Sequence, residues 1–250
     1  MSAGKTHYNE EFSLDNLGST IQSWLSYHLA IGQYDMIVES SINYPFGDYF
    51  RPYLKNDLHN PPLEFEVKLP QFKYKRCDAK CILNDGSIYF FEFKYTKNGS
   101  TLEEYEQARV LFDLIRLRSI AETSKKIFIM CGKSDEFEMT FKNFDTNKSV
   151  NLNNQKKKNA VPLLPSNYFY KKLFSFDLTD SATRSKQIDL TSNDSDIVRC
   201  VKAFHDDYEK KCFENVDDFV KKMSHIETKL EWLSPEGVTA CVGIWSVETF

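Results

Sequence analysis

No run of about 18 apolar residues occurs in this chain of 250 residues, so a membrane-spanning helix is not expected. The first residues, MSAGKTHYNEEF, lack the apolar centre of a secretory signal, so secretion is not indicated either. Basic residues are not in excess: 32 Lys and Arg face 36 Asp and Glu, a net charge of −4. The chain as a whole therefore does not attract nucleic acid, and any DNA contact must come from a local basic patch.

Ready-made metal motifs are missing too. The six cysteines are scattered without a C-x-x-C pair, and the five histidines show no metal-ligand spacing. This cysteine usage is typical of reduced, mostly buried thiols in a cytoplasmic protein, and zinc is not expected. The chain is rich in apolar residues: 41% are hydrophobic and 14% are aromatic. That is enough for the core of one large soluble domain, or of one domain with an appendage.

The most informative stretch is RCDAKCILNDGSIYFFEFKY, residues 76–95. Its two halves are rich in β-branched and aromatic residues, and the triplet Asn84-Asp85-Gly86 between them is a turn signal. The stretch therefore predicts a β-hairpin made of strands 76–83 and 88–95.

Two registers are open to this hairpin. A two-residue turn would pair Ala79 with Glu92 and would mix charged and aromatic side chains on one face. A three-residue loop, with Gly86 in the left-handed conformation of a bulge, shifts the pairing by one residue and sets Asp78 across from Glu92. Such a shift turns every side chain to the other face. We favour the three-residue loop because it avoids burying unpaired charges, which is strongly unfavourable.

In this register one face is free of charge and the other carries the acids and lysines. The first face holds Cys77, Ala79, Cys81, Leu83, Tyr89, Phe91, Phe93 and Tyr95, and the second holds Arg76, Asp78, Lys80, Glu92 and Lys94. Asp78 and Glu92 then lie on neighbouring strands, within reach of one metal ion, with Lys94 two residues further on the same face. Hard oxygen ligands on a sheet suit Mg²⁺.

A bound Mg²⁺ can polarise a phosphodiester and acidify an attacking water, and a neighbouring lysine can orient that water and stabilise the developing negative charge. Acids and lysines also occur on the polar face of ordinary hairpins, where they are simply solvated. The surroundings favour a site, however. Strand 88–95 is almost entirely aromatic or aliphatic apart from Glu92 and Lys94, as expected of a central strand covered on both faces. Charges on such a strand are costly unless they form ion pairs or belong to a functional site.

The segments before the hairpin predict a helix and two further pieces of strand. Apolar residues recur at helical spacing from 13 to 31, and Gly32 follows as a stop. Segment 34–46, YDMIVESSINYPF, is typical of a strand or a strand-like entry, with Glu39 after three apolar residues. Residues 63–69, LEFEVKL, alternate and predict a strand that pairs with residues 76–83.

The segments after the hairpin predict a crossover. Ser100 and Glu103 form a capping-box pattern at the start of a helix that runs to about residue 122. Residues 125–133, KKIFIMCGK, are a short apolar run typical of a buried parallel strand. Strand, helix and strand together make a right-handed βαβ unit.

The order helix, strand, strand, strand, helix, strand, with Asp78 followed by Glu92-Phe93-Lys94 on the third strand, resembles the core of the PD-(D/E)XK nuclease superfamily. This group includes restriction endonucleases, Holliday junction resolvases and many defence and repair nucleases. The resemblance covers about half of the chain. It implies an α/β fold of the restriction endonuclease type, an αβββαβ core with a mixed central sheet flanked by helices.

The resemblance also implies roles for individual residues. Asp78 matches the metal-binding aspartate of the family, although Cys77 stands where the motif has proline. Glu92 matches the second metal ligand, and the carbonyl of Phe93 adds a further oxygen. Lys94 matches the catalytic lysine. The implied activity is that of a Mg²⁺-dependent endonuclease acting on nucleic acid, in particular DNA, with Mn²⁺ as a substitute metal.

Two further catalytic positions follow from the family pattern. Gln107 matches a helical glutamine of some members, although Leu111 stands where those members have tyrosine. Many members also use an upstream glutamate. Glu39 and Glu66 compete for that role, and we favour Glu39 because its surroundings are more apolar.

The rest of the chain gives weaker signals. Residues 135–144 predict a short amphipathic helix, and the polar segment 145–160 predicts a surface loop. The basic triplet 156–158 in that loop is either solvated or in contact with a DNA phosphate. Residues 168–178 resemble a strand, and the Ser/Thr/Asp-rich segment 179–195 resembles a linker.

Long helical periodicity from 196 to 223 predicts one or two helices, and 238–247 predicts a closing strand. We therefore divide the chain into a nuclease-like domain, 1–178, and a helical C-terminal extension, 179–250, with one continuous domain as the alternative. The extension would pack on the core, form a small cap, or make a surface for a homodimer or a partner protein.

Overall fold

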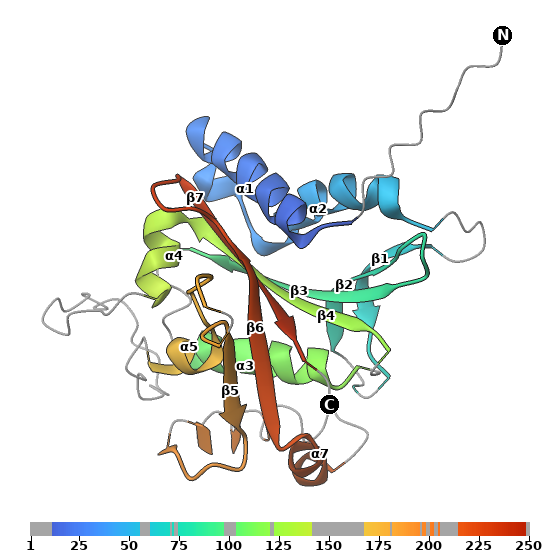
Figure 1. Cartoon of the computed structure of the whole chain (residues 1–250), viewed down its shortest axis with the longest axis vertical. Coiled ribbons are helices and arrows are strands. Elements are labelled where there is room, and N and C mark those ends of the chain that lie inside the picture. Colours follow the sequence, from blue (N-terminus) through green and yellow to red (C-terminus); the bar gives the residue numbers. More distant parts are fainter. Residues whose placement is uncertain are drawn as a thin grey trace, which may run out of the picture.

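The computed structural model describes residues 12–55, 61–70, 72, 75–97, 104–120, 123–141, 168–180, 182–195, 197, 198, 201, 202, 205 and 215–248. One seven-stranded mixed sheet runs through the molecule, in the order β1-β2-β3-β4-β7-β6-β5 (Figure 1). Its strands are β1 Leu63–Lys68, β2 Arg76–Ile82, β3 Ile88–Thr96, β4 Lys125–Lys133, β5 Ser185–Asp189, β6 His225–Leu233 and β7 Ala240–Val247. The fold is therefore α/β.

The centre of the sheet is the crossover that the sequence predicts. β3 and β4 are parallel, and α3, Glu104–Arg118, connects them. All other neighbouring strands are antiparallel. β3 and β4 are almost completely buried, as expected for strands covered on both faces.

Helices cover both faces of the sheet (Figure 1). α1, Leu14–Ala30, and α2, Asn43–Phe50, lie on one face, while α3 and α5, Tyr168–Leu173, lie on the other. α1 begins as predicted, because the Ser13 hydroxyl accepts hydrogen bonds from the amides of Asp15 and Asn16. Each face has its own apolar core, so the charged residues of β3 lie between two hydrophobic layers.

The β2–β3 hairpin has the predicted register. Ala79 pairs with Phe91 and Ile82 with Ile88, and Gly86 has a left-handed φ of +86°. The ladder ends at Ala79, however, so Asp78 and Glu92 do not form a regular cross-strand pair. Cys77 also departs from the prediction. It joins the core beneath α3 rather than the face of Ala79, because β2 has separated from β3 at that point.

The strand predicted for residues 34–46 is wrong. The segment forms two 3₁₀ helices, Tyr34–Met36 and Glu39–Ile42, and then enters α2. Its buried residues explain the difference, because Ile42, Phe46 and Phe50 recur every fourth residue and face the sheet as a helical stripe.

The C-terminal third is not the helical extension that the sequence suggested. Residues expected to form a linker contain the edge strand β5, and β6 was not predicted at all. The predicted closing strand exists as β7, but it lies inside the sheet, between β4 and β6. The strand predicted for 168–178 is also wrong: α5 forms there, because Tyr170, Leu173 and Phe174 make a helical stripe.

Other predictions have mixed outcomes. The short helix expected near 135–144 is present as α4, Ser134–Phe141. α7, Val216–Met223, accounts for the end of the long periodic segment. The capping box at Ser100 and the basic triplet at 156–158 lie outside the described residues. No helix in the described ranges combines the length and the apolar character needed to cross a bilayer.

Candidate functional site

A cavity of about 200 Å³ opens where β2 separates from β3, beneath α3. Charged side chains line most of it: Glu39, Lys75, Asp78, Glu92, Lys94, Arg109, Asp113 and Arg116, with Phe112. The three residues of the predicted acid, acid and lysine motif therefore converge on one space.

The carboxylate of Asp78 accepts a backbone hydrogen bond where the ladder between β2 and β3 has ended. Beyond Ala79 the two strands no longer pair, and the amide of Phe93 donates to Oδ2 of Asp78 at 2.6 Å instead. Burial raises the pKa of Asp78 to about 6, although the Phe93 amide opposes this shift. Asp78 and Glu92 both line the cavity, and the negative charge of Asp78 adds to the rise in the pKa of Glu92.

Glu92 is the most deeply buried acid of the cavity, with 1% of its surface exposed. Arg116 of α3 holds it: Nε and Nη2 of the guanidinium donate to Oε1 at 3.2 and 3.1 Å. Arg116 also pairs with Asp113, one turn earlier on the same helix. Burial raises the pKa of Glu92 well above its usual range, while the guanidinium acts in the opposite direction.

Glu39 forms the opposite wall. The 3₁₀ helix Glu39–Ile42 brings its carboxylate 3.6 Å from Nζ of Lys94, and the amide of Tyr95 donates to the same oxygen at 3.4 Å. Burial raises the pKa of Glu39 to about 7, against the attraction of Lys94. However, 44% of the side chain is exposed, so water screens part of this effect.

The remaining predicted positions are less closely associated with the cavity. Glu66, the competitor of Glu39, is exposed on β1 and does not line the cavity. Gln107 lies on α3, but its side chain falls outside the described residues. The amide of Phe93 is engaged by Asp78, and its side chain packs in the core on the α1 and α2 side.

Sequence reasoning missed Arg116 and Asp113. A signal was present, because Asp113 and Arg116 are three positions apart in a stretch, 110–117, whose other residues are all apolar and buried: Val110, Leu111, Phe112, Leu114, Ile115 and Leu117. On such a helix a charged side chain has to find a buried partner. That reasoning predicts a partner for Asp113 and Arg116, but not that it is Glu92.

The donors present fit Mg²⁺ or Mn²⁺ in chemistry. Asp78 and Glu92 offer hard carboxylate oxygens at one place, and Mg²⁺ is commonly held by one or two carboxylates together with water and substrate phosphate. A cage of three or more acidic, His or Cys side chains does not occur among the residues that the structure describes. The site therefore suits a cation that takes part of its coordination from water and substrate.

Known proteins offer no independent guide to the site: the chain matches no protein-family model, no curated protein and no solved structure.

Proposed function

We propose that the protein is a metal-dependent nuclease of the PD-(D/E)XK type that hydrolyses phosphodiester bonds, in particular those of DNA. The observation that carries this proposal is the convergence of Asp78, Glu92 and Lys94 on one cavity, where β2 separates from β3. The αβββαβ order of α1, β1, β2, β3, α3 and β4, with β3 and β4 parallel, agrees with such a core.

Asp78 and Glu92 are the residues that would hold Mg²⁺. A bound Mg²⁺ would polarise the phosphodiester, lower the pKa of an attacking water and neutralise the charge that develops. The protein supplies rigidity. Asp78 is fixed by the Phe93 amide and Glu92 by Arg116, so neither carboxylate has to be ordered when the cation arrives.

Lys94 would act on the nucleophile. Its side chain is 11% exposed and its ammonium group lies 3.6 Å from the Glu39 carboxylate, so a water beside this ion pair can contact both charges. The burial of Lys94 strengthens its electrostatic effect on a phosphate. Lys75 and Arg109, the more exposed cations of the lining, would provide the local basic patch that a chain of net charge −4 needs.

A cleavage assay tests the proposal. Duplex, single-stranded and branched DNA, and RNA, are incubated with Mg²⁺ or Mn²⁺. We expect Asp78→Asn and Lys94→Ala each to lower the cleavage rate by at least ~10³-fold, because each removes a group that acts in the transition state. Full activity of either variant would refute the proposal.

Matched controls come from the same hairpin. Lys80 lies on β2 and pairs with Glu64 at 2.9 Å, outside the cavity, and Asp85 lies in the exposed turn. Lys80→Ala and Asp85→Ala remove the same charges from the same element, so we expect both variants to keep the wild-type rate. Circular dichroism of all four variants checks that the fold is retained.

A second candidate is a nuclease-like fold without nuclease activity, which serves as a binding or assembly module. The ion pair between Arg116 and Glu92 favours it, since a buried guanidinium can neutralise the acid that a metal would otherwise neutralise. Metal titration separates the two candidates. If the protein is a nuclease, Mg²⁺ or Mn²⁺ at a concentration of a hundred times the dissociation constant should raise the free energy of unfolding by ~2.7 kcal/mol. The substitution Asp78→Asn should remove this increase. A binding or assembly module without a metal site should show no such increase.

A further inference from the structure

The thiol of Cys77 binds the backbone of β3 at the point where the hairpin opens. The ladder between β2 and β3 ends at the pair of Ala79 and Phe91, while β2 stays paired with β1 as far as Arg76. In the open part, Sγ of Cys77 lies 3.0 Å from the carbonyl oxygen of Phe91, whereas the carbonyl oxygen of Ala79 is 3.7 Å away. Because a carbonyl oxygen can only accept, the thiol is the donor of this bond.

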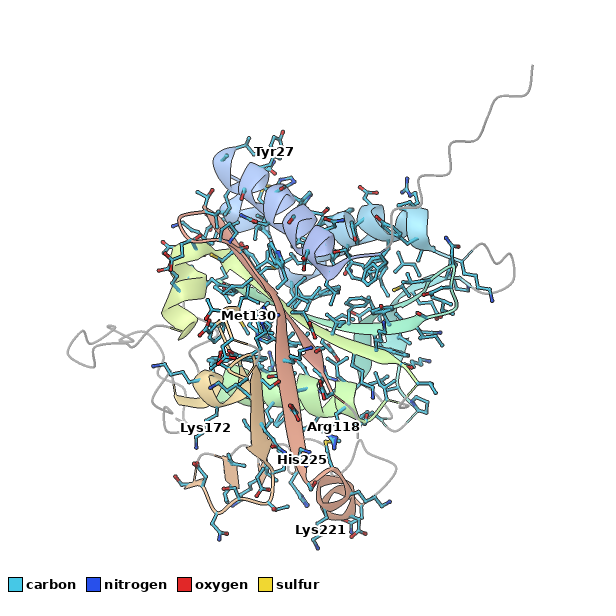
Figure 2. All side chains as sticks on the ribbon, viewed as in Figure 1. Tyr27, Arg118, Met130, Lys172, Lys221 and His225 are labelled. Carbon is cyan, nitrogen blue, oxygen red and sulfur yellow. The ribbon has the colours of Figure 1, made fainter. Side chains whose placement is uncertain are left out.

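The surroundings of Cys77 keep its thiol in the donating form. The residue is 0% exposed and belongs to the same apolar core as Met130, which Figure 2 shows in the interior of the molecule. Burial raises the pKa of the thiol well above its usual range, and the negative charges of Glu92 and Asp78 raise it further. Cys77 is therefore a neutral hydrogen-bond donor close to both candidate metal ligands.

Two hydrogen bonds from side chains of β2 flank Glu92. The carbonyl of Phe91, which accepts the Cys77 thiol, belongs to the peptide unit before Glu92. The amide of Phe93, which donates to Asp78, belongs to the peptide unit after it. The main chain of Glu92 is thus held on both sides, although the regular ladder has ended there.

We propose that Cys77 is a positioning residue of the metal site: by holding the carbonyl of Phe91, its thiol fixes the main chain from which Glu92 reaches the cation. This inference rests on the proposed function, because Glu92 is a candidate ligand of the same site. It also gives a role to the cysteine that stands where the family motif has proline, a residue without a side-chain donor. Groups that orient a metal ligand contribute to metal affinity without touching the metal.

Two substitutions separate this role from simple packing. Cys77→Ala keeps an apolar side chain and removes the donor, whereas Cys77→Ser keeps a donor but places a hydroxyl in an apolar core. If the thiol only fills the core, alanine is the better replacement in every measurement. If the thiol positions Glu92, serine is the better replacement for metal binding, even where it lowers the free energy of unfolding.

Calorimetric titration of the whole chain with Mn²⁺ alone measures this binding. We expect the affinity of Cys77→Ala to be ~5-fold lower than that of the wild-type protein, somewhat less than the ~10-fold loss typical when a group that contacts a ligand directly is removed. Cys77→Ser should stay within ~2-fold of the wild-type affinity, since its hydroxyl replaces the donor. Circular dichroism of each variant verifies folding.

The matched control is Cys81. It lies on the same strand and is equally buried, but it pairs with Tyr89 where the ladder is intact, and it packs in the core on the α1 and α2 side. Cys81→Ala should therefore bind Mn²⁺ with the wild-type affinity. Asp78→Asn should weaken binding by at least ~10-fold and so identifies the cavity as the place of binding.

A second measurement does not depend on the metal. Hydrogen exchange of the Phe93 amide in EDTA reports whether the main chain beside Glu92 is held. We expect this exchange to be ~3-fold faster in Cys77→Ala, the effect of losing a weak hydrogen bond, and close to the wild-type rate in Cys77→Ser.

The outcomes separate this inference from the proposed function. A wild-type protein that binds Mn²⁺ no better than Cys77→Ala, or a folded Cys77→Ser variant that binds it no better than Cys77→Ala, would overturn the role of Cys77 and leave the metal site in place. No binding of Mn²⁺ by the wild-type protein would overturn the metal site itself, and the inference with it.

Discussion

Asp78 is both a candidate ligand and a structural partner of the backbone. Its carboxylate accepts the Phe93 amide at 2.6 Å, at the point where the ladder between β2 and β3 has ended. A substitution that leaves this amide unpaired costs about 1–3 kcal/mol. Asparagine keeps an oxygen that can accept the bond, whereas alanine does not. Comparison of Asp78→Asn with Asp78→Ala therefore separates the chemistry of the site from its stability.

The raised pKa of Asp78 predicts how stability depends on pH. Burial raises this pKa from 3.8 to about 6, so the folded protein holds a proton that the unfolded chain releases. Between these two values the free energy of unfolding should fall as pH rises, by up to ~3 kcal/mol from Asp78 alone. Urea denaturation in EDTA, at intervals from pH ~4 to pH ~7, measures this slope.

The control for this experiment is Asp78→Asn, which does not titrate. We expect its free energy of unfolding to fall less steeply over the same range, and the remaining slope to reflect Glu39 and Glu92, whose pKa values are also raised by burial. Parallel curves for the two proteins would mean that Asp78 keeps an ordinary pKa and is not buried in the folded state.

At the scale of elements, the hairpin turn depends on one backbone conformation. Gly86 has φ = +86°, and a Cβ atom built on it would meet nothing within 4 Å. The cost of Gly86→Ala is therefore conformational only, and we expect a loss of about 1–2 kcal/mol in the free energy of unfolding.

Gly47 provides the opposite case. It lies inside α2, and a Cβ atom there would make ordinary contacts, the nearest at 3.8 Å to Leu63. Gly47→Ala should stabilise the protein by about 0.4–1 kcal/mol. Equal effects of the two substitutions in chemical denaturation would contradict this assignment of the turn.

The segment that carries Glu39 is held to β3 by Lys97. Nζ of Lys97 donates to the carbonyls of Tyr34, Asp35 and Ile37 at 3.3, 2.9 and 3.4 Å, and it also lies over the Tyr34 ring. Lys97→Met keeps the aliphatic stem and removes these bonds. We expect amide hydrogen exchange in residues 34–42 to become at least ~5-fold faster, which corresponds to about 1 kcal/mol.

Lys133 is the matched control, because it also lies over the ring of Tyr34 but pairs with Asp135 in solvent. Lys133→Met should leave the exchange of residues 34–42 unchanged. If both variants, or neither, accelerate the exchange, the carbonyl contacts of Lys97 are not what fixes the position of Glu39.

The sequence predicted elements well where one period dominated. α1, β3, α3 and β4 were predicted because their apolar residues follow a clear helical spacing or form a continuous buried run. The helical stripes of α2 and α5 were hidden by short runs of residues that favour strands. β6 was missed although Ile226, Thr228 and Leu230 alternate as buried residues, and β5 has little signal, since Ile188 is its only buried residue.

For the site, the local sequence predicted that the motif residues converge, but it did not predict which residues surround them. Asp78, Glu92 and Lys94 lie on one hairpin, so register and turn type predict their convergence. The contacts of Glu92 with Arg116 and of Lys94 with Glu39 join residues 24 and 55 positions apart in the chain. Such contacts depend on how a helix and a 3₁₀ turn pack against the sheet, which periodicity does not specify.

At the scale of the whole molecule, a single sheet unites the two segments that the sequence divides at residue 178. β7 pairs with β4 along seven residues, and its Trp245 packs against Phe128 and Phe174. We expect a fragment of residues 1–178 to lack a cooperative unfolding transition, because the edge of β4 and the core around Phe128 would be exposed. Circular dichroism during thermal unfolding measures this.

Supplying residues 179–250 as a separate chain is the complementary experiment. Addition of this second fragment should restore cooperative unfolding if its strands complete the sheet. A fragment 1–178 that unfolds cooperatively by itself would show instead that the nuclease-like segment is an independent domain.

The position of β7 has a consequence for biosynthesis. The residues that line the cavity lie between 39 and 116, so a ribosome releases all of them well before it makes residues 240–247. Until then β4 has a partner on one edge alone, and its other edge offers unpaired amides and carbonyls to any neighbouring chain. The nascent protein can thus contain every residue of its candidate site while it is still prone to aggregate.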